Sequence, residues 1–406
     1  MKFAVDSKTR TSYCQRRSLE QMFTWFVYAL MCVAVTGQRR SRFGLRRWSL
    51  ASTVGGPGCA VVGGGLENGD CCPHNITTTN DYGLVPRNLT HVHLIFSYSH
   101  RVEFGRGTLP QQLGGPQLVR LLMSVRYAPH RRLPTGFFVN LARLRSVQLY
   151  HDAPSANHFS LRLSEGTFDG LSEVVELQLA QLGIENLPAG VFRGLSSICR
   201  LDLSQNRLAV IGSDVFQPQP ISTSSGSTEN HCCRNLTVLS LGRNRFVDVA
   251  DIQLSGLTSL RSVDLYDNAI TTLYRDSFGG RINSSSGGFA NVEQLNLGHN
   301  VVDHVGDSAF ERLARLRVLY LDENMIRNVS ASAFIGLSMV EEMDLGGNSM
   351  SELPSGVFVP LTSLRTLYLA TNAIETVQTG NDTHQTDFTD FLLNFRLFLL
   401  IRYFSF

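Results

Sequence analysis

The sequence predicts an α/β solenoid, in which about ten repeats of 24 residues stack into a curved rod with a parallel β-sheet on its concave face. Two observations support this prediction. The pattern LxxLxLxxNxL recurs along the chain with starts that are mostly 24 residues apart, and self-similarity at such a period is typical of stacked repeats. A phenylalanine also lies eighteen residues after most of these starts. Repeats of this kind cannot bury their apolar faces alone, so they stack into one continuous core.

Seven copies of the pattern are clear, and three weaker copies precede them. The clear copies begin at residues 198, 236, 260, 292, 316, 340 and 364, and the weaker ones at 118, 144 and 174. Two polar inserts, 217–235 and 281–288, lengthen the repeats in which they lie. We therefore expect one solenoid over residues 117–378.

Each repeat should contain a short strand followed by a turn. The apolar and polar alternation in LxLxx indicates a strand with one buried face. The Asn that follows can both donate to and accept from the backbone of neighbouring coils, so stacked copies should form a ladder that satisfies buried turn groups. The ladder positions are Asn206, Asn244, Asn268, Asn300, Asn324, Asn348 and Asn372. The rings expected to fill the convex side of the core are Phe192, Phe216, Phe278, Phe310, Phe334 and Phe358.

Two stretches resemble known repeats in detail. LPAGVFRGLSSICRLDLSQNRLAVI (187–211) and LPSGVFVPLTSLRTLYLATNAI (353–374) resemble the leucine-rich repeat family, and within it the ectodomains of invertebrate Toll-type receptors. The resemblance implies an extracellular module that binds a protein or microbial ligand and signals in innate immunity or development, with two ectodomains able to pair. The alternative is a secreted matrix or adhesion protein that uses the same solenoid without signalling.

The family pattern also implies segments that this sequence does not contain. Toll-type receptors carry a cysteine-rich C-terminal cap, a transmembrane helix and a cytoplasmic signalling domain, whereas no cysteine follows Cys233 here. The chain is therefore expected to be a truncated ectodomain. The apolar tail 379–406 contains Asp390, Arg396 and Arg402, and charged residues are costly in a bilayer. A membrane-spanning role for the tail is disfavoured, and its status stays open.

Residues 1–37 have the layout of a secretory signal. Basic residues precede the apolar run Met22–Val35, which ends in small residues. Because fourteen residues are short for a bilayer-spanning helix, we favour a cleaved signal peptide over a signal anchor. A buried helix or an artefact of the gene model are the other readings. Contact with a membrane is then expected only through such an anchor or through a missing C-terminal segment.

Residues 38–70 are predicted to form a linker that is first basic and then rich in glycine. Residues 1–50 carry a net charge of +8, while residues 51–406 carry −6. The solenoid itself is therefore mildly acidic, which argues against a nucleic-acid partner because phosphates need cationic contacts. Residues 71–116 faintly resemble the N-terminal cap of extracellular leucine-rich repeat proteins.

The cysteines allow several pairings. The resemblance to an N-terminal cap implies disulfides among Cys59, Cys71 and Cys72, although such caps usually have four cysteines. Cys232 and Cys233 lie in the long insert, and one of them could bridge to Cys199 in the preceding repeat. Free or differently paired thiols are an equal alternative.

Six N-x-Ser/Thr sequons indicate a glycosylated, secreted or cell-surface chain, given the signal-like N-terminus. They begin at Asn75, Asn88, Asn235, Asn283, Asn328 and Asn381. Asn283 and Asn381 lie in polar segments and are the strongest candidates.

Binding is expected on the concave face, the usual binding surface of solenoids. The outward-facing residues form an acidic patch with tyrosines among the carboxylates, and tyrosine is typical of interface anchors. The candidates are Asp264, Tyr266, Asn296, His299, Tyr320, Asp322, Glu341, Asp344 and Tyr368.

Catalysis has no support in the sequence. His91 and His93 alternate on a predicted strand, but no third ligand or acid accompanies them at a recognisable spacing. Neither a CxxC pair nor a matched Cys/His set is present, which argues against a zinc site. We therefore predict a protein that is not an enzyme and that has no catalytic residue, metal site or cofactor.

Overall fold

The computed structural model describes residues 59–62, 91–94, 118–125, 132–139, 141–151, 159–216, 232–279, 288–374 and 376–377. The chain divides into two units, Met1–Pro57 and Gly58–Phe406, and every described residue lies in the second. The predicted signal segment, most of the predicted linker and the apolar tail lie outside the described residues. So do Cys71, Cys72 and the side chain of Cys59.

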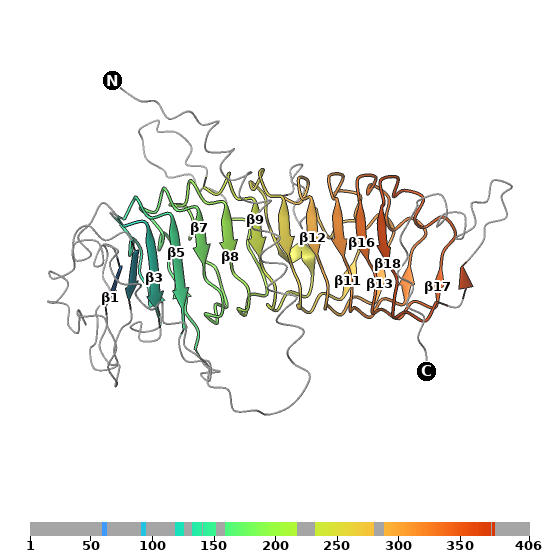
Figure 1. The fold of residues 1–406 in the computed structure, drawn as a ribbon, viewed down its shortest axis with the longest axis horizontal. Coiled ribbons are helices and arrows are strands. Elements are labelled where there is room, and N and C mark those ends of the chain that lie inside the picture. The colour runs from blue at the N-terminus through green and yellow to red at the C-terminus, as the bar shows by residue number, and fades with distance from the viewer. Residues whose placement is uncertain are drawn as a thin grey trace, which may run out of the picture. The chain divides into compact units, whose positions relative to one another are not determined.

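A parallel sheet of twelve short strands runs the length of the solenoid (Figure 1). The strands of the repeats contain the LxL motif, whose leucine-type residues point into the core, and each strand pairs in register with the next coil. The twelve strands, in order, are β1 (Cys59–Val62), β2 (His91–Leu94), β3 (Arg120–Ser124), β5 (Ser146–Tyr150), β7 (Glu176–Gln178), β8 (Arg200–Asp202), β9 (Val238–Ser240), β10 (Ser262–Asp264), β12 (Gln294–Asn296), β14 (Val318–Tyr320), β16 (Glu342–Asp344) and β18 (Thr366–Tyr368). Ten of them, β3 to β18, belong to the ten predicted repeats, so the predicted solenoid is confirmed.

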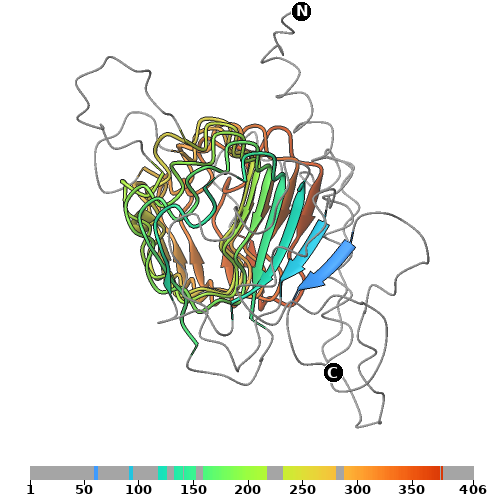
Figure 2. The ribbon, with the colours of Figure 1, turned by 90° about the vertical axis from the view of Figure 1, so that its left-hand side faces the viewer.

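Three smaller parallel sheets of two-residue strands lie across the coils from the main sheet (Figure 2). Their strands are β4 (Arg132–Leu133) and β6 (Arg162–Leu163), then β11 (Thr272–Leu273), β13 (His304–Val305) and β15 (Asn328–Val329), and finally β17 (Glu352–Leu353) and β19 (Thr376–Val377). The only helix in the described segments is a 3₁₀ turn, Val249–Asp251, capped by the Asp248 side chain. The α component of the expected fold class is therefore small. No helix in this part of the chain has the length and apolar character needed to cross a membrane.

The core is a continuous column of leucines on the sheet side and phenylalanine rings on the opposite side. The apolar residues of the LxxLxL motif are almost fully buried in the coils from β3 on, apart from the half-buried Leu369 in the last of them. Rings of neighbouring coils stack at centroid separations of 5.5–6.1 Å, as in Phe192 on Phe216 and Phe310 on Phe334. In the coil of β9 this place is taken by the buried Leu254, which interrupts the stack between Phe216 and Phe278. One apolar column thus links all coils.

The N-terminal part of the sheet differs from the prediction. Strand β1 lies inside the segment expected to be a linker, because Cys59–Val62 is a short apolar, β-prone run between glycines that can pair with an open sheet edge. It pairs with β2, which contains His91 and His93, and β2 pairs with β3. The sheet therefore begins two strands before the first predicted repeat.

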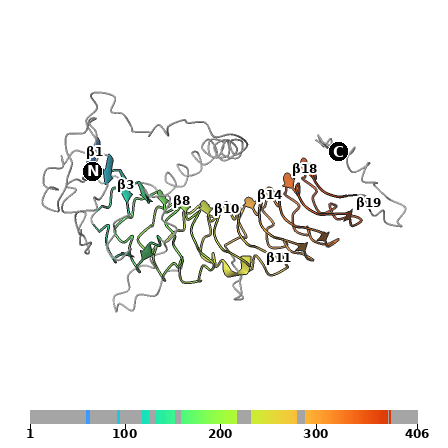
Figure 3. The ribbon, with the colours of Figure 1, turned by 90° about the horizontal axis from the view of Figure 1, so that it is seen from below.

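The sheet is on the inner, concave side of the arc formed by the coils (Figure 3). The two inserts do not disturb its register. Arg200 pairs with Val238 across the long insert and Ser262 with Gln294 across the short one, while uninterrupted coils pair residues 24 apart, such as Val318 and Glu342. Side chains at equivalent repeat positions therefore form straight rows across the concave face.

Candidate functional site

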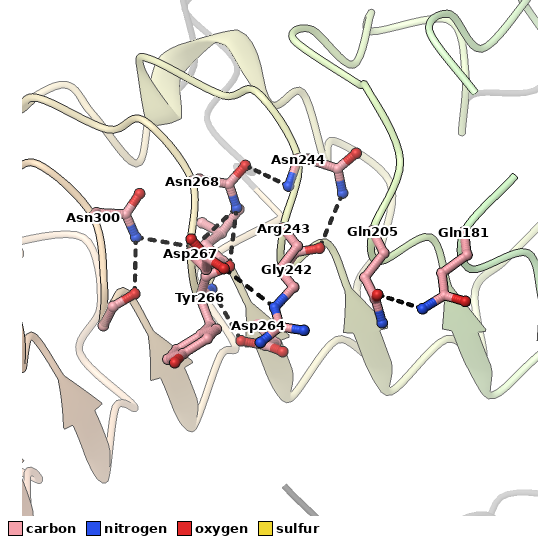
Figure 4. A network of polar contacts seen from close by, with 12 residues as sticks. Gln181, Gln205, Gly242, Arg243, Asn244, Asp264, Tyr266, Asp267, Asn268 and Asn300 are labelled. Carbon is pink, nitrogen blue, oxygen red and sulfur yellow. Dashed lines mark hydrogen bonds and ion pairs between the residues drawn. The ribbon is translucent and has the colours of Figure 1, made fainter. Parts of the chain in front are cut away.

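The asparagines of the repeat fix the turns that border the concave face. In each case the side-chain nitrogen donates to at least one carbonyl oxygen in its own coil and to one in the preceding coil, while its oxygen accepts a backbone N–H of the preceding coil. For Asn300 these partners are Leu297 O at 2.9 Å, Leu265 O at 3.0 Å and Ile270 N at 3.1 Å. Figure 4 shows this ladder from Asn244 to Asn300.

All seven predicted ladder residues make these contacts. Asn206, Asn300, Asn324 and Asn348 are buried, and Asn244, Asn268 and Asn372 are half-buried. Where the first clear repeat meets the irregular one, the N–H groups of Leu182 and Ile184 both donate to the Asn206 oxygen. The ladder ties each coil to the one before it, so it holds the rows of outward-facing side chains at a constant spacing.

The acidic residues at the ends of the strands have a structural role that sequence reasoning did not identify. The carboxylates of Asp264 and Asp344 accept the backbone N–H two residues further on, from Tyr266 at 3.1 Å and Gly346 at 2.8 Å. Asn296 makes the same bond to Gly298 N at 3.0 Å. A short side chain with an oxygen at this place closes the turn after the strand. The Asp or Asn preference at this repeat position was the available signal.

Five of the predicted binding residues form one continuous row across adjacent strands. Backbone pairing aligns Asp264, Asn296, Tyr320, Asp344 and Tyr368 in that order from β10 to β18. Tyr368 is exposed and the other four are half-buried. The structure therefore brings these residues together on the concave sheet.

Three further candidates border this row on the turns. Tyr266 and His299 lie side by side, with ring centroids 4.7 Å apart, and the His299 N–H donates to the Asp322 carbonyl oxygen at 2.9 Å. His299 has a positive φ of 55°, which few non-glycine residues adopt, and its side chain is exposed. Tyr266, His299 and Asp322 thus extend the same surface along one edge.

Glu341 does not belong to the row. It precedes β16 and forms ion pairs with Arg317 and with Arg365, the latter at 3.2 Å. In the coils before it, Arg261 pairs with Glu293 at 3.1 Å. Glu341 is therefore neutralised by its neighbours in a ladder of alternating charges beside the sheet.

Glu342 is a residue of this surface that sequence reasoning missed. It is half-buried on β16, and its carboxylate accepts the Tyr320 hydroxyl at 3.2 Å. The signal that could have found it is its place in the strand, two residues before Asp344, since alternate strand residues share a face.

Burial weakens the acidity of the carboxylates in this row. It raises the pKa of Asp264 and that of Asp344 from 3.8 to about 6. For Asp344 the nearby charges of Asp322 and Glu342 add to the effect, while the hydrogen bond from Gly346 opposes it. Burial also raises the pKa of Asp322 and the pKa of the Tyr320 hydroxyl, where Glu342 contributes as well.

Of the two alternatives for the cysteines of the long insert, the bridge to Cys199 is wrong and the free thiols are present. Cys232 and Cys233 are both buried free thiols, so neither is the partner of Cys199, which is disulfide-bonded. The reason lies in the repeat register. Cys233 occupies the core position that Leu195 has in the preceding coil, and its N–H donates to the Leu195 carbonyl oxygen at 3.4 Å. The Cys232 thiol instead contacts the carbonyl oxygen of Phe216 at 3.3 Å.

Two of the six predicted sequons lie within the described residues, and both asparagines are exposed. Asn328 lies on β15, away from the main sheet, and Asn235 donates to the Ser196 carbonyl oxygen at 3.1 Å. Asn75, Asn88, Asn283 and Asn381 lie outside the described residues. Within the described ranges, no three His, Cys, Asp or Glu side chains are placed to hold a metal ion.

Comparisons with known proteins agree with this geometry. Residues 234–281 and 315–374 match the family model described as leucine rich repeat, and no curated protein matches the sequence. The fold is similar to a chain in the glycosylated Toll–Spatzle complex of Drosophila, with a TM-score of 0.52 and 19% identity, over 72% of this chain and 34% of that chain. It is also similar to a chain in the TLR13–ssRNA13 complex, with a TM-score of 0.52 and 22% identity, over 73% of this chain and 42% of that chain.

This chain therefore spans less than half the length of either of these relatives. The family model covers repeats in the middle and C-terminal parts of the solenoid, and the strand register extends the same repeat to the other coils. The chain contains leucine-rich repeats, and the fold of its solenoid is similar to that of the chains in the Toll and TLR13 complexes.

Proposed function

We propose that this protein is an extracellular binding module that recognises a protein partner through the concave sheet and carries out no chemistry itself. The observation that carries the proposal is the row from Asp264 to Tyr368, which presents polar and aromatic side chains on five adjacent strands. Within this row, Asp264, Asn296 and Asp344 have a structural role, because their side chains accept the backbone hydrogen bond that closes the following turn. The tyrosines are not needed for the core, which the leucines of the same strands fill.

The chemistry of the row suits a protein partner. Tyrosine offers a rigid ring with a polar tip, the character of interface anchors, and both Tyr320 and Tyr368 are accessible. The carboxylates disfavour nucleic acid, because a phosphate backbone needs cationic contacts. In the similar structures, Toll is in complex with Spatzle and TLR13 with ssRNA. We propose a protein ligand in the Toll-like manner for this chain, in innate immune or developmental signalling.

An extracellular or cell-surface location belongs to the same proposal. Its support is the signal-like N-terminus and the exposed sequons at Asn235 and Asn328. Asn328 lies on the strands opposite the concave sheet, so a glycan there would leave the proposed binding face uncovered.

A glycan placed on the concave face tests the proposal. Val238→Asn with Ser240→Thr creates a sequon on β9, on the concave face. The matched control is Arg162→Asn, which creates a sequon with the existing Ser164 and places the glycan on β6, away from that face. Secreted full-length chain is measured against a panel of purified extracellular proteins, with glycan occupancy verified by mass. We expect binding to a panel member that the β9 glycan abolishes and the β6 glycan leaves unchanged. Equal effects of the two glycans, or no binding to any panel member, would contradict the proposal.

A further inference from the structure

We infer that the C-terminal part of the concave sheet, formed by β14, β16 and β18, binds a cationic segment of the protein partner. In this arrangement an arginine or lysine side chain lies against Asp344 and Glu342, and the rings of Tyr320 and Tyr368 pack beside it. The inference rests on the proposed function and specifies the kind of partner and its place of contact.

The two tyrosines border the two carboxylates on three successive strands. Asp344 pairs with Tyr320 on one side and with Tyr368 on the other. Neighbouring strands are about 4.8 Å apart, so the backbones of the two tyrosines are about 10 Å apart with β16 between them. A cation near the faces of aromatic rings is attracted to them, and the carboxylates supply the opposite charge. This combination fits a guanidinium or ammonium group.

The surface has an unbalanced negative charge. The outward-facing residues of its strands and of β12 include two carboxylates and no basic side chain: Gln294, Asn296, Val318, Tyr320, Glu342, Asp344, Thr366 and Tyr368. The turns after these strands add Asp322 and Glu323, with His299 as their one basic group, while Arg317 and Arg365 directly before β14 and β18 pair with Glu341.

Several acidic residues elsewhere on the solenoid have cationic partners of their own. Arg200 pairs with Glu176 at 3.3 Å, and Arg243 with Asp267 at 3.2 Å. Over the described residues, neither Glu342 nor Asp344 has an ion pair with an arginine or lysine. Charge complementarity therefore favours a basic partner at this place.

Asp344 and the neighbouring Asp322 are half-buried and remain accessible from the concave side. Glycines in the turns leave room for the acids: a Cβ on Gly346 would lie 3.1 Å from Asp344 Oδ1, and one on Gly298 would lie 2.6 Å from Asp322 Oδ1. No side chain at these two places covers the carboxylates. The raised pKa of Asp344 is consistent with this environment, in which a partner cation gains more than it would at a fully hydrated carboxylate.

Asp344→Asn removes the negative charge of this side chain while keeping the hydrogen bond that closes its turn. Asn296 occupies the same repeat position and closes its turn with the same bond, so asparagine at 344 should preserve the bond to Gly346. Asp202→Asn is the matched control, because Asp202 accepts Ser204 N at 2.9 Å in an equivalent turn outside this surface. Glu342→Gln and Tyr368→Ala remove the second carboxylate and the exposed ring.

The probes are fluorescent nonapeptides of arginine, of lysine and of glutamate, titrated against the full chain and followed by anisotropy. We expect the cationic peptides to bind and the glutamate peptide not to bind. Asp344→Asn should weaken cationic binding about tenfold, the usual worth of a hydrogen-bonded charge, while Asp202→Asn should leave it unchanged. Glu342→Gln and Tyr368→Ala should each weaken it as well.

Equal losses in Asp344→Asn and Asp202→Asn would mean that only the overall charge attracts the peptide, and this result would overturn the inference. Cationic peptides that do not bind would do the same. A different result would contradict the proposed function: a β9 glycan that leaves the binding of every panel protein intact. A panel partner that the glycan blocks but Asp344→Asn does not affect would overturn the inference alone.

Discussion

Asn324 illustrates how much one amide side chain contributes to this fold. Its oxygen accepts the Val302 N–H at 3.0 Å, and its nitrogen donates to the carbonyl oxygens of Leu297 at 3.0 Å and Leu321 at 3.1 Å. The residue is buried, so water cannot replace these bonds. No other short side chain has both the donors and the acceptor that this place requires.

Asn324→Ala should therefore lower the free energy of unfolding by about 1–3 kcal/mol, the usual cost of leaving buried groups unsatisfied. Urea denaturation followed by circular dichroism measures the change. Asn372→Ala is the matched control, since Asn372 makes the same bonds from a half-buried position in the last clear coil and should cost less. Equal stabilities of wild type and Asn324→Ala would contradict the role of the ladder.

The phenylalanine column stabilises the side of each coil that lies opposite the strands of the main sheet. Phe334 is fully buried and stacks between Phe310 and Phe358, with centroids 6.1 Å and 5.9 Å away. The strands supply backbone pairing on one side of each coil, while these rings fill the volume on the other side, where regular secondary structure is sparse.

Phe334→Ala should destabilise the solenoid by about 3–5 kcal/mol through the lost burial and the cavity left behind. Phe334→Leu should cost clearly less, because Leu254 occupies the same repeat position in the coil of β9 and is equally buried. Thermal and urea unfolding of the two variants compare the effects. If alanine and leucine cost the same, the cavity argument is wrong.

The strands and the rows of the concave face could be predicted because both follow from one period. The LxL alternation placed the strands of the main sheet from β3 to β18, and counting from each repeat start placed Tyr320, Asp344 and Tyr368 in one row. Other features depend on contacts between coils that no single repeat encodes. The bond from Tyr320 to Glu342 and the ion pairs of Glu341 are of this kind.

Single departures from the repeat were also beyond prediction. Cys233 looks like a cysteine available for pairing, but in space it replaces a core leucine. Strand β1 has no LxL motif and becomes a strand because a neighbouring edge is open to pair with it. In both cases the deciding information is the neighbour in the stack, which lies about one period or more away along the chain.

For the molecule as a whole, the concave face gives stability an unusual dependence on pH. The pKa values of Asp264 and Asp344 are about 6 in the folded chain, against an ordinary value of 3.8. Between these values the folded state binds more protons than the unfolded state. The contribution of these groups is therefore fully present below about pH 4 and is lost as the pH rises through 6.

Asp264→Asn isolates this contribution, since Asn296 shows that the neutral side chain closes the same turn. The variant should have a higher thermal midpoint than wild type at pH 7.5, and the difference should shrink through pH 4 and vanish by about pH 3, below the pKa of the carboxyl in both states. Differential scanning calorimetry across this range measures it. A gap that is constant with pH, or that widens on acidification, would contradict the prediction.

The two inserts let the solenoid change its length of chain without changing its geometry. Both leave the coil after the phenylalanine column, far from the sheet, and the strands on either side keep their pairing. Each coil thus has a sheet side, where the strand pairing must stay regular, and an opposite side, where additional residues can be inserted. A whole foreign domain inserted between Phe216 and Cys232 should therefore leave the pairing of β8 with β9, and the spacing of the strands, unchanged.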